Sequence, residues 1–149
     1  MMRLVYLAFK VYCFFVRPLI LGVRIMMMQD GKVLLVRHTY LEGWFMPGGG
    51  VKRRETFDQA ARREAREEVG AELNEISLVG AYSNFIELKS DHNILFFSND
   101  FTLNGKHDCE IAEARFFPLD NLPEKLWPGH RRLLEEYRAG VKHKQFGEW

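Results

Sequence analysis

The chain has 149 residues, with 21 basic and 20 acidic side chains that leave a formal net charge of +1. This length predicts a single domain that needs no disulfide staples, because it can bury about 68–70% of the surface of its unfolded form. The near-neutral charge argues against a general binding surface for nucleic acid polymers. Neither Cys13 nor Cys109 has the spacing of a disulfide framework or a metal site, so we expect small buried hydrophobes in a reducing, cytoplasmic compartment.

Residues 1–17 are predicted to form an apolar helix. Between Leu4 and Val16 the sequence is apolar and aromatic except at Lys10, and Arg17-Pro18 closes the run. It is shorter than the roughly 20 residues that span a membrane, and it lacks the cleavage site of a secretory signal, so we predict neither a membrane span nor its removal. We expect this helix to pack on the domain or on a second copy of the chain, as in a homodimer. Association with a membrane surface is the less favoured alternative.

Residues 18–140 are predicted to form the domain itself, which begins with two strands. Residues 19–28 and 32–40 are almost continuously apolar, as is typical of strands that are covered on both faces. They are joined at Asp30-Gly31, a dipeptide that favours a two-residue hairpin turn. Residues 41–50 then form a loop, which carries Trp44 and Phe45 and leads into the most informative part of the chain.

That part is a glycine-rich loop followed by a charged helix. The loop, Gly48 to Gly50, can adopt positive φ angles and approach a ligand closely. Good helix formers fill residues 57–69, and Gly70 stands where a C-terminal cap belongs, so we predict a helix over this range.

Three carboxylates of this helix share one face. Glu64, Glu67 and Glu68 are spaced i, i+3 and i+4, which places their side chains on the same side. Like charges at this spacing destabilise an isolated helix by roughly 0.2–0.5 kcal/mol per pair. A divalent cation would reverse that effect, and oxygen ligands are those that Mg²⁺ and Mn²⁺ prefer. The pattern therefore favours a metal site, while a solvated, salt-bridged helix face is the alternative explanation.

The rest of the chain adds strands and one helix. Residues 76–88 and 94–103 are predicted strands separated by the turn signal Ser90-Asp91, and residues 113–118 form a short strand. Residues 119–123 are a predicted turn. Residues 129–139 form a closing helix, with Leu133, Leu134 and Tyr137 at helical spacing. Residues 141–149 are a C-terminal tail without a clear pattern. The alternation of strands and helices predicts an α/β fold.

The glycine loop and charged helix resemble the signature of the Nudix hydrolase family. That signature is Gly, five residues, Glu, seven residues, then Arg-Glu-aliphatic-any-Glu-Glu-any-Gly-aliphatic, and both intervals are correct in this chain. The matching residues are Gly49, Glu55, Arg63, Glu64, Ala65, Glu67, Glu68, Gly70 and Ala71. Two alanines stand at the aliphatic positions, where larger side chains are usual, and this departure affects packing and none of the charged positions.

The resemblance implies a Nudix fold, a mixed β-sheet sandwiched between α-helices. It also implies hydrolysis of a nucleoside diphosphate linked to another moiety, by attack of a water activated by Mg²⁺ or Mn²⁺. Glu64, Glu67 and Glu68 match the metal-binding carboxylates, and the carbonyl of Gly48 can complete the metal shell. Glu64 either acts as the general base or positions it, with Glu67 beside it, and Arg63 orients the carboxylates. Structural roles fall to Gly49, Glu55 and Gly70.

Residues outside the signature are harder to assign. The family often supplies a fourth acid from a later loop, for which Glu110 is the first candidate and Glu113 the second, and an exposed loop acid is the alternative for each. Arg37 resembles a position that meets phosphate or base in several relatives, and an arginine in solvent is the equal alternative. His38 lies near the expected mouth of the site. The other histidines considered, His107, His130 and His143, show no ligand spacing and are expected on the surface.

The sequence limits the substrate class mainly through the subfamily motifs that it lacks. No proline lies between Ala71 and Phe117, whereas the ADP-ribose group typically has one about sixteen residues after the signature. The Ser-Gln-Pro-Trp run of the NADH group and the extended motif of the coenzyme A group are also absent. We therefore expect a nucleoside triphosphate or a small nucleotide sugar rather than NADH or coenzyme A. The alternative function is a non-catalytic Nudix-fold module that senses a nucleotide or mediates an interaction.

Overall fold

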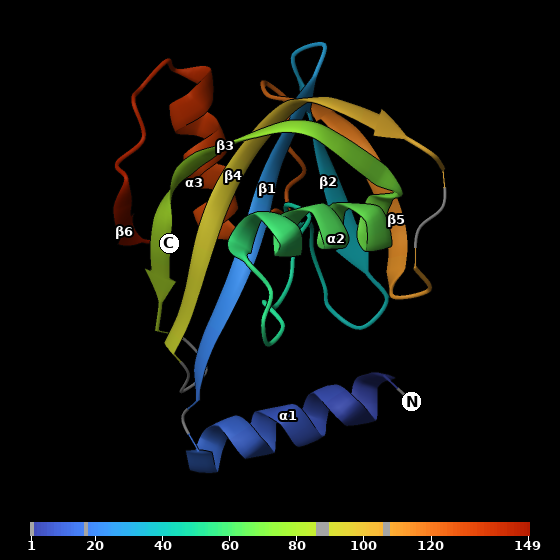
Figure 1. Ribbon diagram of the computed structural model, residues 1–149, viewed down its shortest axis with the longest axis vertical. Coiled ribbons are helices and arrows are strands. Elements are labelled where there is room, and N and C mark those ends of the chain that lie inside the picture. Colours follow the sequence, from blue (N-terminus) through green and yellow to red (C-terminus); the bar gives the residue numbers. More distant parts are fainter. Residues whose placement is uncertain (1, 17, 86–89, 106–107) are drawn as a thin grey trace.

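The computed structural model describes residues 2–16, 18–85, 90–105 and 108–149, and within them a mixed sheet lies between helices (Figure 1). The elements in chain order are α1 (Met2–Val16), β1 (Leu19–Gln29), β2 (Lys32–His38), α2 (Phe57–Val69), β3 (Ala71–Asn84), β4 (Ser90–Leu103), β5 (Ile111–Pro118), α3 (Pro128–Arg138) and β6 (Phe146–Glu148). The strand order is β5-β2-β1-β4-β3-β6. Strand β1 runs parallel to β4, as β3 does to β6, and the other neighbours are antiparallel.

The centre of this sheet is opened by the loop that precedes α2. Strands β1 and β2 are joined by Asp30-Gly31, which both have positive φ angles (50° and 72°) and form the predicted hairpin turn. The two strands pair with each other only beside this turn. Further along, the loop takes the place of β2, because Val23 N donates to Gly49 O and Ile25 N donates to Pro47 O, both at 2.9 Å. The glycine loop is thus fixed by the backbone of β1 at the middle of the sheet.

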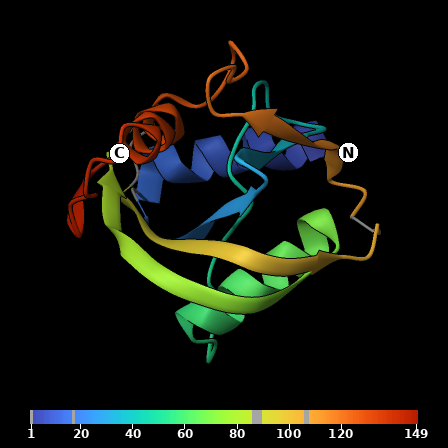
Figure 2. The same cartoon turned by 90° about the horizontal axis from the view of Figure 1, so that it is seen from above.

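Both faces of the sheet are buried against a helix. Figure 2 shows the curved sheet between α2 on one side and α3 on the other. Alternate residues of β1 belong to two separate apolar clusters: Val23 and Ile25 pack in the cluster with α2, whereas Met26 and Met28 pack in the cluster with α3. This arrangement confirms that the apolar run of β1 is covered on both faces, and it gives the loop and α2 a rigid support.

Three elements differ from the sequence predictions. Ser90-Asp91 does not form a turn but starts β4, where both residues pair with β1; the end of the predicted strand 76–88 lies outside the described residues. The tail contains β6, and Trp149 packs its ring 5.4 Å from that of Tyr82. Helix α1 lies below the sheet, beyond the start of β1, and each of its side chains that the structure describes is exposed (Figure 1). None of its described side chains covers the domain's core, so packing on a second copy stays the untested part of the prediction.

Three side chains predicted from composition or spacing also lie elsewhere. Cys109 is exposed rather than buried, because it sits in the loop before β5. His130 is 2% exposed rather than on the surface, and its Nδ1 accepts a hydrogen bond of 3.0 Å from Met46 N. His143 is half-buried, with its Nδ1 3.0 Å from Glu136. His107 and the side chain of Cys13 lie outside the described residues.

Candidate active site

The ends of α2 are fixed by local signals in the sequence. At its start, Thr56 Oγ1 accepts a hydrogen bond from Gln59 N, and Gln59 Oε1 accepts one from Thr56 N, which forms a capping box. At its end, Gly70 has a φ of 63° and its N–H caps carbonyls of the last turn. These caps fix where the helix begins and ends, whereas its rotation is set by the buried residues Ala60, Ala61, Ala65 and Val69, which pack in the core.

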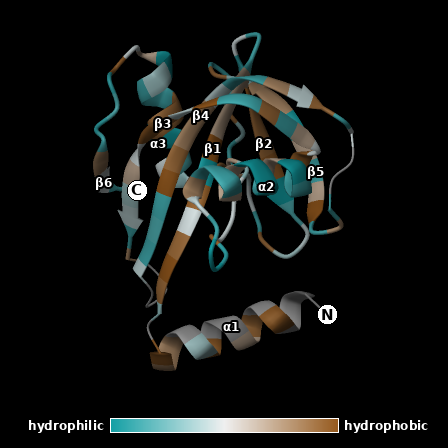
Figure 3. Ribbon diagram, in the orientation of Figure 1, coloured by the Kyte–Doolittle hydropathy of each residue, from teal (hydrophilic) through white to brown (hydrophobic). Residues whose placement is uncertain are grey.

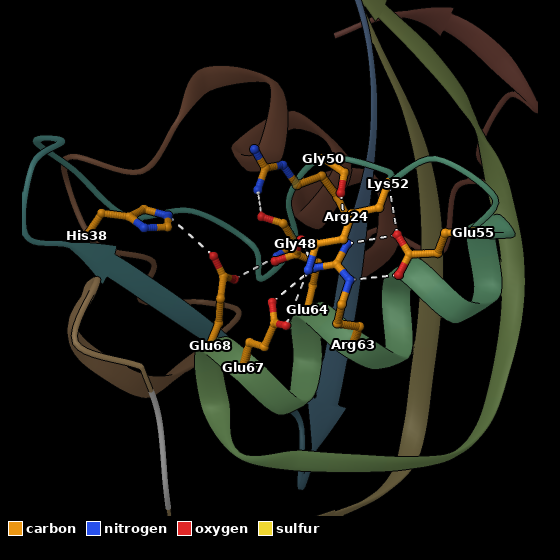
Figure 4. Close-up of polar contacts among 10 residues, drawn as sticks. All are labelled: Arg24, His38, Gly48, Gly50, Lys52, Glu55, Arg63, Glu64, Glu67 and Glu68. Atoms are coloured by element: carbon orange, nitrogen blue, oxygen red, sulfur yellow. Dashed lines mark hydrogen bonds and ion pairs between the residues drawn. The ribbon is translucent and has the colours of Figure 1, made fainter. Parts of the chain in front are cut away.

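Arg63 donates hydrogen bonds to three glutamates and to the glycine loop. Its Nε and Nη2 donate to the two oxygens of Glu55 at 2.7 and 2.9 Å. Its Nη1 donates to Glu64 (2.5 Å) and Glu67 (2.9 Å), and Nη2 also donates to Gly50 O (2.9 Å). The bidentate bond to Arg63 lowers the pKa of Glu55 to about 2, so Glu55 stays ionised and holds the guanidinium in place. Arg63 therefore orients Glu64 and Glu67 (Figure 4).

The glycine loop approaches both α2 and β1 so closely that side chains are excluded. Gly48 has a φ of 142°, and a Cβ there would lie 2.1 Å from Val23 O. A Cβ on Gly49 would lie 2.7 Å from the carboxyl carbon of Glu64. At Gly50, by contrast, a Cβ would meet nothing within 4 Å. The first two glycines are required by packing, and for Gly49 this is a physical cause of its place in the signature.

Glu68 is the most buried of the carboxylates, with 8% of its surface exposed. Its Oε2 accepts a hydrogen bond of 2.8 Å from Gly48 N, and its Oε1 lies 3.8 Å from His38 Nε2. Burial raises the pKa of Glu68 to about 8, although the positive charge of Arg24 opposes the shift. Burial and Arg24 lower the pKa of His38 to about 4, so this imidazole is neutral at pH 7. His38 Nδ1 is buried and has no hydrogen-bond partner among the described residues.

Arg24 forms a hydrogen bond with the carbonyl oxygen of Gly48, which the sequence analysis assigned as a metal ligand. It extends from β1, and its Nη1 donates to Gly48 O (Figure 4). Its charge also bears on the pKa values of Glu64 and Glu68, where it favours the ionised carboxylates. A guanidinium thus compensates part of the negative charge around the glycine loop.

The carboxylates face a cavity of about 300 Å³ between α2 and the loop before β5. Of the candidates outside the signature, Glu110 lines this cavity, together with Lys52 and Asp108. Glu113 and Arg37 do not: they form an exposed ion pair of 3.1 Å across β2 and β5. The full lining is Gly50, Lys52, Arg63, Glu64, Glu67, Glu68, Asp108, Glu110 and Ile111.

Sequence reasoning missed Arg24, Lys52 and Asp108 as neighbours of the carboxylates. Arg24 could have been noticed as the only charged residue within the apolar run of β1. Asp108 stands two positions before the candidate Glu110, so the same search for loop acids could have included it. Lys52 lies inside the signature interval, where no residue type is fixed, and no sequence signal distinguishes it.

The donor set fits a hard divalent cation. The carboxylates and the carbonyl offer oxygen atoms only, which suits Mg²⁺ or Mn²⁺. Within the described residues, no three acidic, histidine or cysteine side chains form a ready metal cluster as they stand. Burial raises the pKa of Glu64 as well as that of Glu68, so both carboxylates lack full compensation, which a cation would supply. The chemistry and the charge of the site are therefore consistent with such an ion.

Comparisons with known proteins agree with this geometry. A family model described as the NUDIX domain matches residues 18–137. The chain is 34% identical over 114 residues to an ADP-ribose pyrophosphatase of Methanocaldococcus jannaschii, covering 73% of this chain and 67% of that protein. It is 31% identical over 116 residues to a CMP-5'-(N-acetyl-N-hydroxy-3-aminopropyl)phosphonate hydrolase of Streptomyces rubellomurinus, covering 72% of this chain and 56% of that protein.

A solved structure confirms the predicted fold. The crystal structure of a MutT NUDIX hydrolase from Burkholderia pseudomallei matches with a TM-score of 0.71 and 23% identity, over 78% of this chain and 96% of that one. The mixed sheet sandwiched between helices is therefore correct as predicted.

Proposed function

We propose that this chain, which belongs to the NUDIX family, is a divalent-metal-dependent pyrophosphohydrolase that acts on a nucleoside diphosphate linked to another moiety. The family match confirms the resemblance to Nudix hydrolases that was found in the sequence, since it covers residues 18–137. The chain spans 67% and 56% of the two curated relatives described above, so their activities are used here only as support.

One observation carries the proposal. Three glutamates of α2 face a cavity of about 300 Å³, and the most buried of them, Glu68, has its pKa raised to about 8. A carboxylate is buried at this cost in structures where a positive group completes its surroundings, or where function requires it. Arg24 gives only part of that compensation, because the pKa of Glu68 remains raised in its presence.

The residues of the chain divide the work as follows. The carboxylates of Glu64, Glu67, Glu68 and Glu110, with Gly48 O, would hold Mg²⁺ or Mn²⁺. When bound, this ion neutralises phosphate oxygens and lowers the pKa of a water.

Proton transfer and positioning are left to the side chains around the cavity. Glu64, whose pKa is raised by burial, accepts the proton of the water that attacks phosphorus, or holds the group that does so. Arg63 keeps Glu64 and Glu67 in position through its hydrogen bonds of 2.5 and 2.9 Å. Lys52, 61% exposed and 3.6 Å from Glu67, offers a positive charge to a substrate phosphate at the cavity. The attack forms one phosphorus–oxygen bond and breaks the anhydride bond.

The activities named for the two relatives and the motifs that are absent support the proposed substrate class. ADP-ribose and the CMP phosphonate are each a nucleotide joined to another group. A nucleoside triphosphate or a nucleotide sugar meets the same description, and we propose one of these ahead of NADH or coenzyme A. Arg37 stays a proposed substrate contact. It lies outside the cavity, 6.0 Å from the ring centroid of Trp44, where a longer substrate could meet it.

A screen that measures inorganic phosphate after pyrophosphatase or phosphatase has cleaved the products tests the proposal. The chain is assayed with Mg²⁺ and with Mn²⁺ on nucleoside triphosphates, nucleotide sugars, ADP-ribose and dinucleoside polyphosphates, with Glu68→Gln as the blank. Glu72→Gln is the matched control, because Glu72 is an exposed acid just beyond α2, paired with Arg66. We expect turnover that Glu72→Gln keeps and Glu68→Gln loses. Binding of these nucleotides without turnover would instead favour the non-catalytic sensing module.

A further inference from the structure

Helix α1 exposes apolar side chains. Every side chain that the structure describes in it is exposed, and they include Phe14 at 60% and Phe15 at 77%. The described side chains are Val5, Leu7, Ala8, Val11, Tyr12, Phe14, Phe15 and Val16. Figure 3 shows brown, apolar segments in α1, which lies apart from the sheet. Contiguous apolar exposure of this kind marks an interaction surface.

The charged residues in and next to α1 are all basic, and they recur every seven residues. Residues 1–29 contain no acidic residue. Within α1 the only charged positions are Arg3 and Lys10, seven residues or about two turns apart, and Arg17 follows at the same interval in the sequence. At about 100° per residue the described apolar side chains cover an arc of roughly 200° beside this basic line. The described apolar side chains of the helix therefore form a wide arc next to a line of basic positions.

The loop between Gly50 and α2, on the same side of the molecule as α1, also carries exposed cations. Figure 1 shows the loop between Gly50 and α2 hanging on the side of the sheet where α1 lies. Arg53 and Arg54 of this loop are exposed and form no ion pair within the described residues. Beside them, Leu21 and Phe57 line a shallow apolar hollow of about 570 Å³. Exposed cations and apolar side chains thus occur together on this side of the molecule.

The helix is too short to cross a bilayer. Its 15 residues extend about 22 Å, less than the roughly 30 Å hydrocarbon core. No helix in the described part of the chain is long and apolar enough to span a membrane. Aromatic residues and a border of cations are instead the composition of helices that lie in the interface plane.

From these observations we propose that α1, with the Arg53-Arg54 loop, docks this protein on an anionic lipid surface. The apolar arc enters the boundary between headgroups and acyl chains, and the basic positions meet the anionic headgroups. A second copy of the chain is a poorer occupant, because pairing two such helices brings two basic lines together without an acid to oppose them. This inference does not depend on the proposed reaction.

Vesicle co-sedimentation of the full chain tests the docking. Vesicles of phosphatidylcholine alone are compared with vesicles that contain one third phosphatidylglycerol, at low and at high salt. We expect binding to the anionic vesicles, weaker binding at 0.5 M salt, and little binding to the neutral ones. Lys10→Glu should weaken binding about tenfold or more, since it changes two charge units near the surface. Phe14→Ser with Phe15→Ser should weaken it about a hundredfold, because two phenyl rings no longer enter the membrane.

Matched control variants outside α1 and the Arg53-Arg54 loop distinguish docking through α1 from non-specific adsorption to vesicles. Leu78→Ser with Phe146→Ser removes two hydrophobics of similar exposure, 68% and 76%, and Lys142→Glu reverses an exposed charge; both should bind like the parent chain. Equal binding to neutral and anionic vesicles, or none to either, would overturn the proposal. So would a dimer, seen by light scattering, that the Phe14/Phe15 variant dissociates while no vesicle binding is found. Lys10→Glu keeps the test decisive if the phenylalanine variant does not fold.

Discussion

Replacing Glu68 by Gln should remove a pH dependence of stability that the metal-free protein shows above pH 6.5. Burial raises the pKa of Glu68 from 4.5 to about 8 in the folded chain. Between these values the unfolded chain has released the proton that the folded chain keeps, so the free energy of unfolding falls as pH rises. A glutamine cannot ionise, and it has nearly the shape of the protonated acid.

His38 and His130 also make the free energy of unfolding depend on pH, and they limit the pH range in which Glu68 dominates. Burial lowers the pKa of His38 to about 4 and that of His130 well below 6.5. Below pH 6.5 the unfolded chain takes up protons at these two positions, so stability rises with pH there and opposes the slope from Glu68. Above pH 6.5 the opposing histidine contribution fades as the unfolded chain releases the remaining histidine protons, so Glu68 governs the change as the pH approaches 8.

The magnitude follows from the width of this window. One proton over about 1.5 pH units, at about 1.36 kcal/mol per unit, sets an upper limit of about 2 kcal/mol for Glu68, and after the opposing histidine contribution the net destabilisation is about 1 kcal/mol. For a chain of this size that corresponds to a melting temperature lower by about 2–4 °C at pH 8 than at pH 6.5.

Thermal unfolding in the presence of a chelator, at pH 6.5, 7.2 and 8.0, measures the slope. We expect the fall in stability to be absent from Glu68→Gln, where only the opposing histidine contribution remains, and to persist in Glu72→Gln, where the exposed acid has its pKa lowered by a hydrogen bond from Arg66. If the parent chain and Glu68→Gln lost stability in parallel over this window, burial of Glu68 would not be the cause, and the reasoning would fail.

Three further variants probe the neighbours of Glu68. Gly49→Ala should lower the rate at least tenfold in steady-state assays, because its Cβ meets the Glu64 carboxyl group, whereas Gly50→Ala, with open space around it, should stay near the parent rate. Arg24→Gln should bind Mn²⁺ about tenfold more tightly in a spectroscopic titration without substrate, since a cation leaves the site; weaker binding would contradict this electrostatic argument. Glu110→Gln should lower the rate about tenfold at saturating Mg²⁺, while Glu113→Gln, at the exposed ion pair with β2, should change it less than twofold; a parent-like rate for the first would remove it from the site.

The parts of the fold that were predictable from sequence depend on local chemistry. The hairpin at Asp30-Gly31 needs positive φ angles, and the end of α2 at Gly70 needs a left-handed residue, so both positions are visible in the residue types. Ser90-Asp91 also has turn character, yet it forms a strand because Leu19 and Ile20 of β1 pair with it. Such pairing joins residues about 70 positions apart, which no local signal reports.

In the candidate site, too, the residues that share one helix were predictable from the sequence, and a residue from a distant strand was not. The signature glutamates lie on one helix, so their common face follows from helical spacing alone, and Arg63 reaches them from the same helix. Arg24 arrives from a different element, and its contact with Gly48 exists only because the loop pairs with β1. His130 was misplaced, although a signal was present: Leu133 and Leu134 follow it by three and four residues and share its buried face.

The charges of the site are balanced by different means, and this bears on how an ion would bind. Arg63 compensates Glu64 and Glu67, and Arg24 satisfies Gly48 O, whereas Glu68 avoids its charge by keeping a proton below about pH 8. An ion that takes Glu68 as a ligand must displace that proton, so its affinity should rise with pH up to about 8 and level off above it. It must also compete with Arg24 for Gly48 O. Because the charge of Arg24 also lowers the pKa of Glu68, metal affinity in Arg24→Gln should be higher where Glu68 is ionised, and it should level off at a higher pH than in the parent chain.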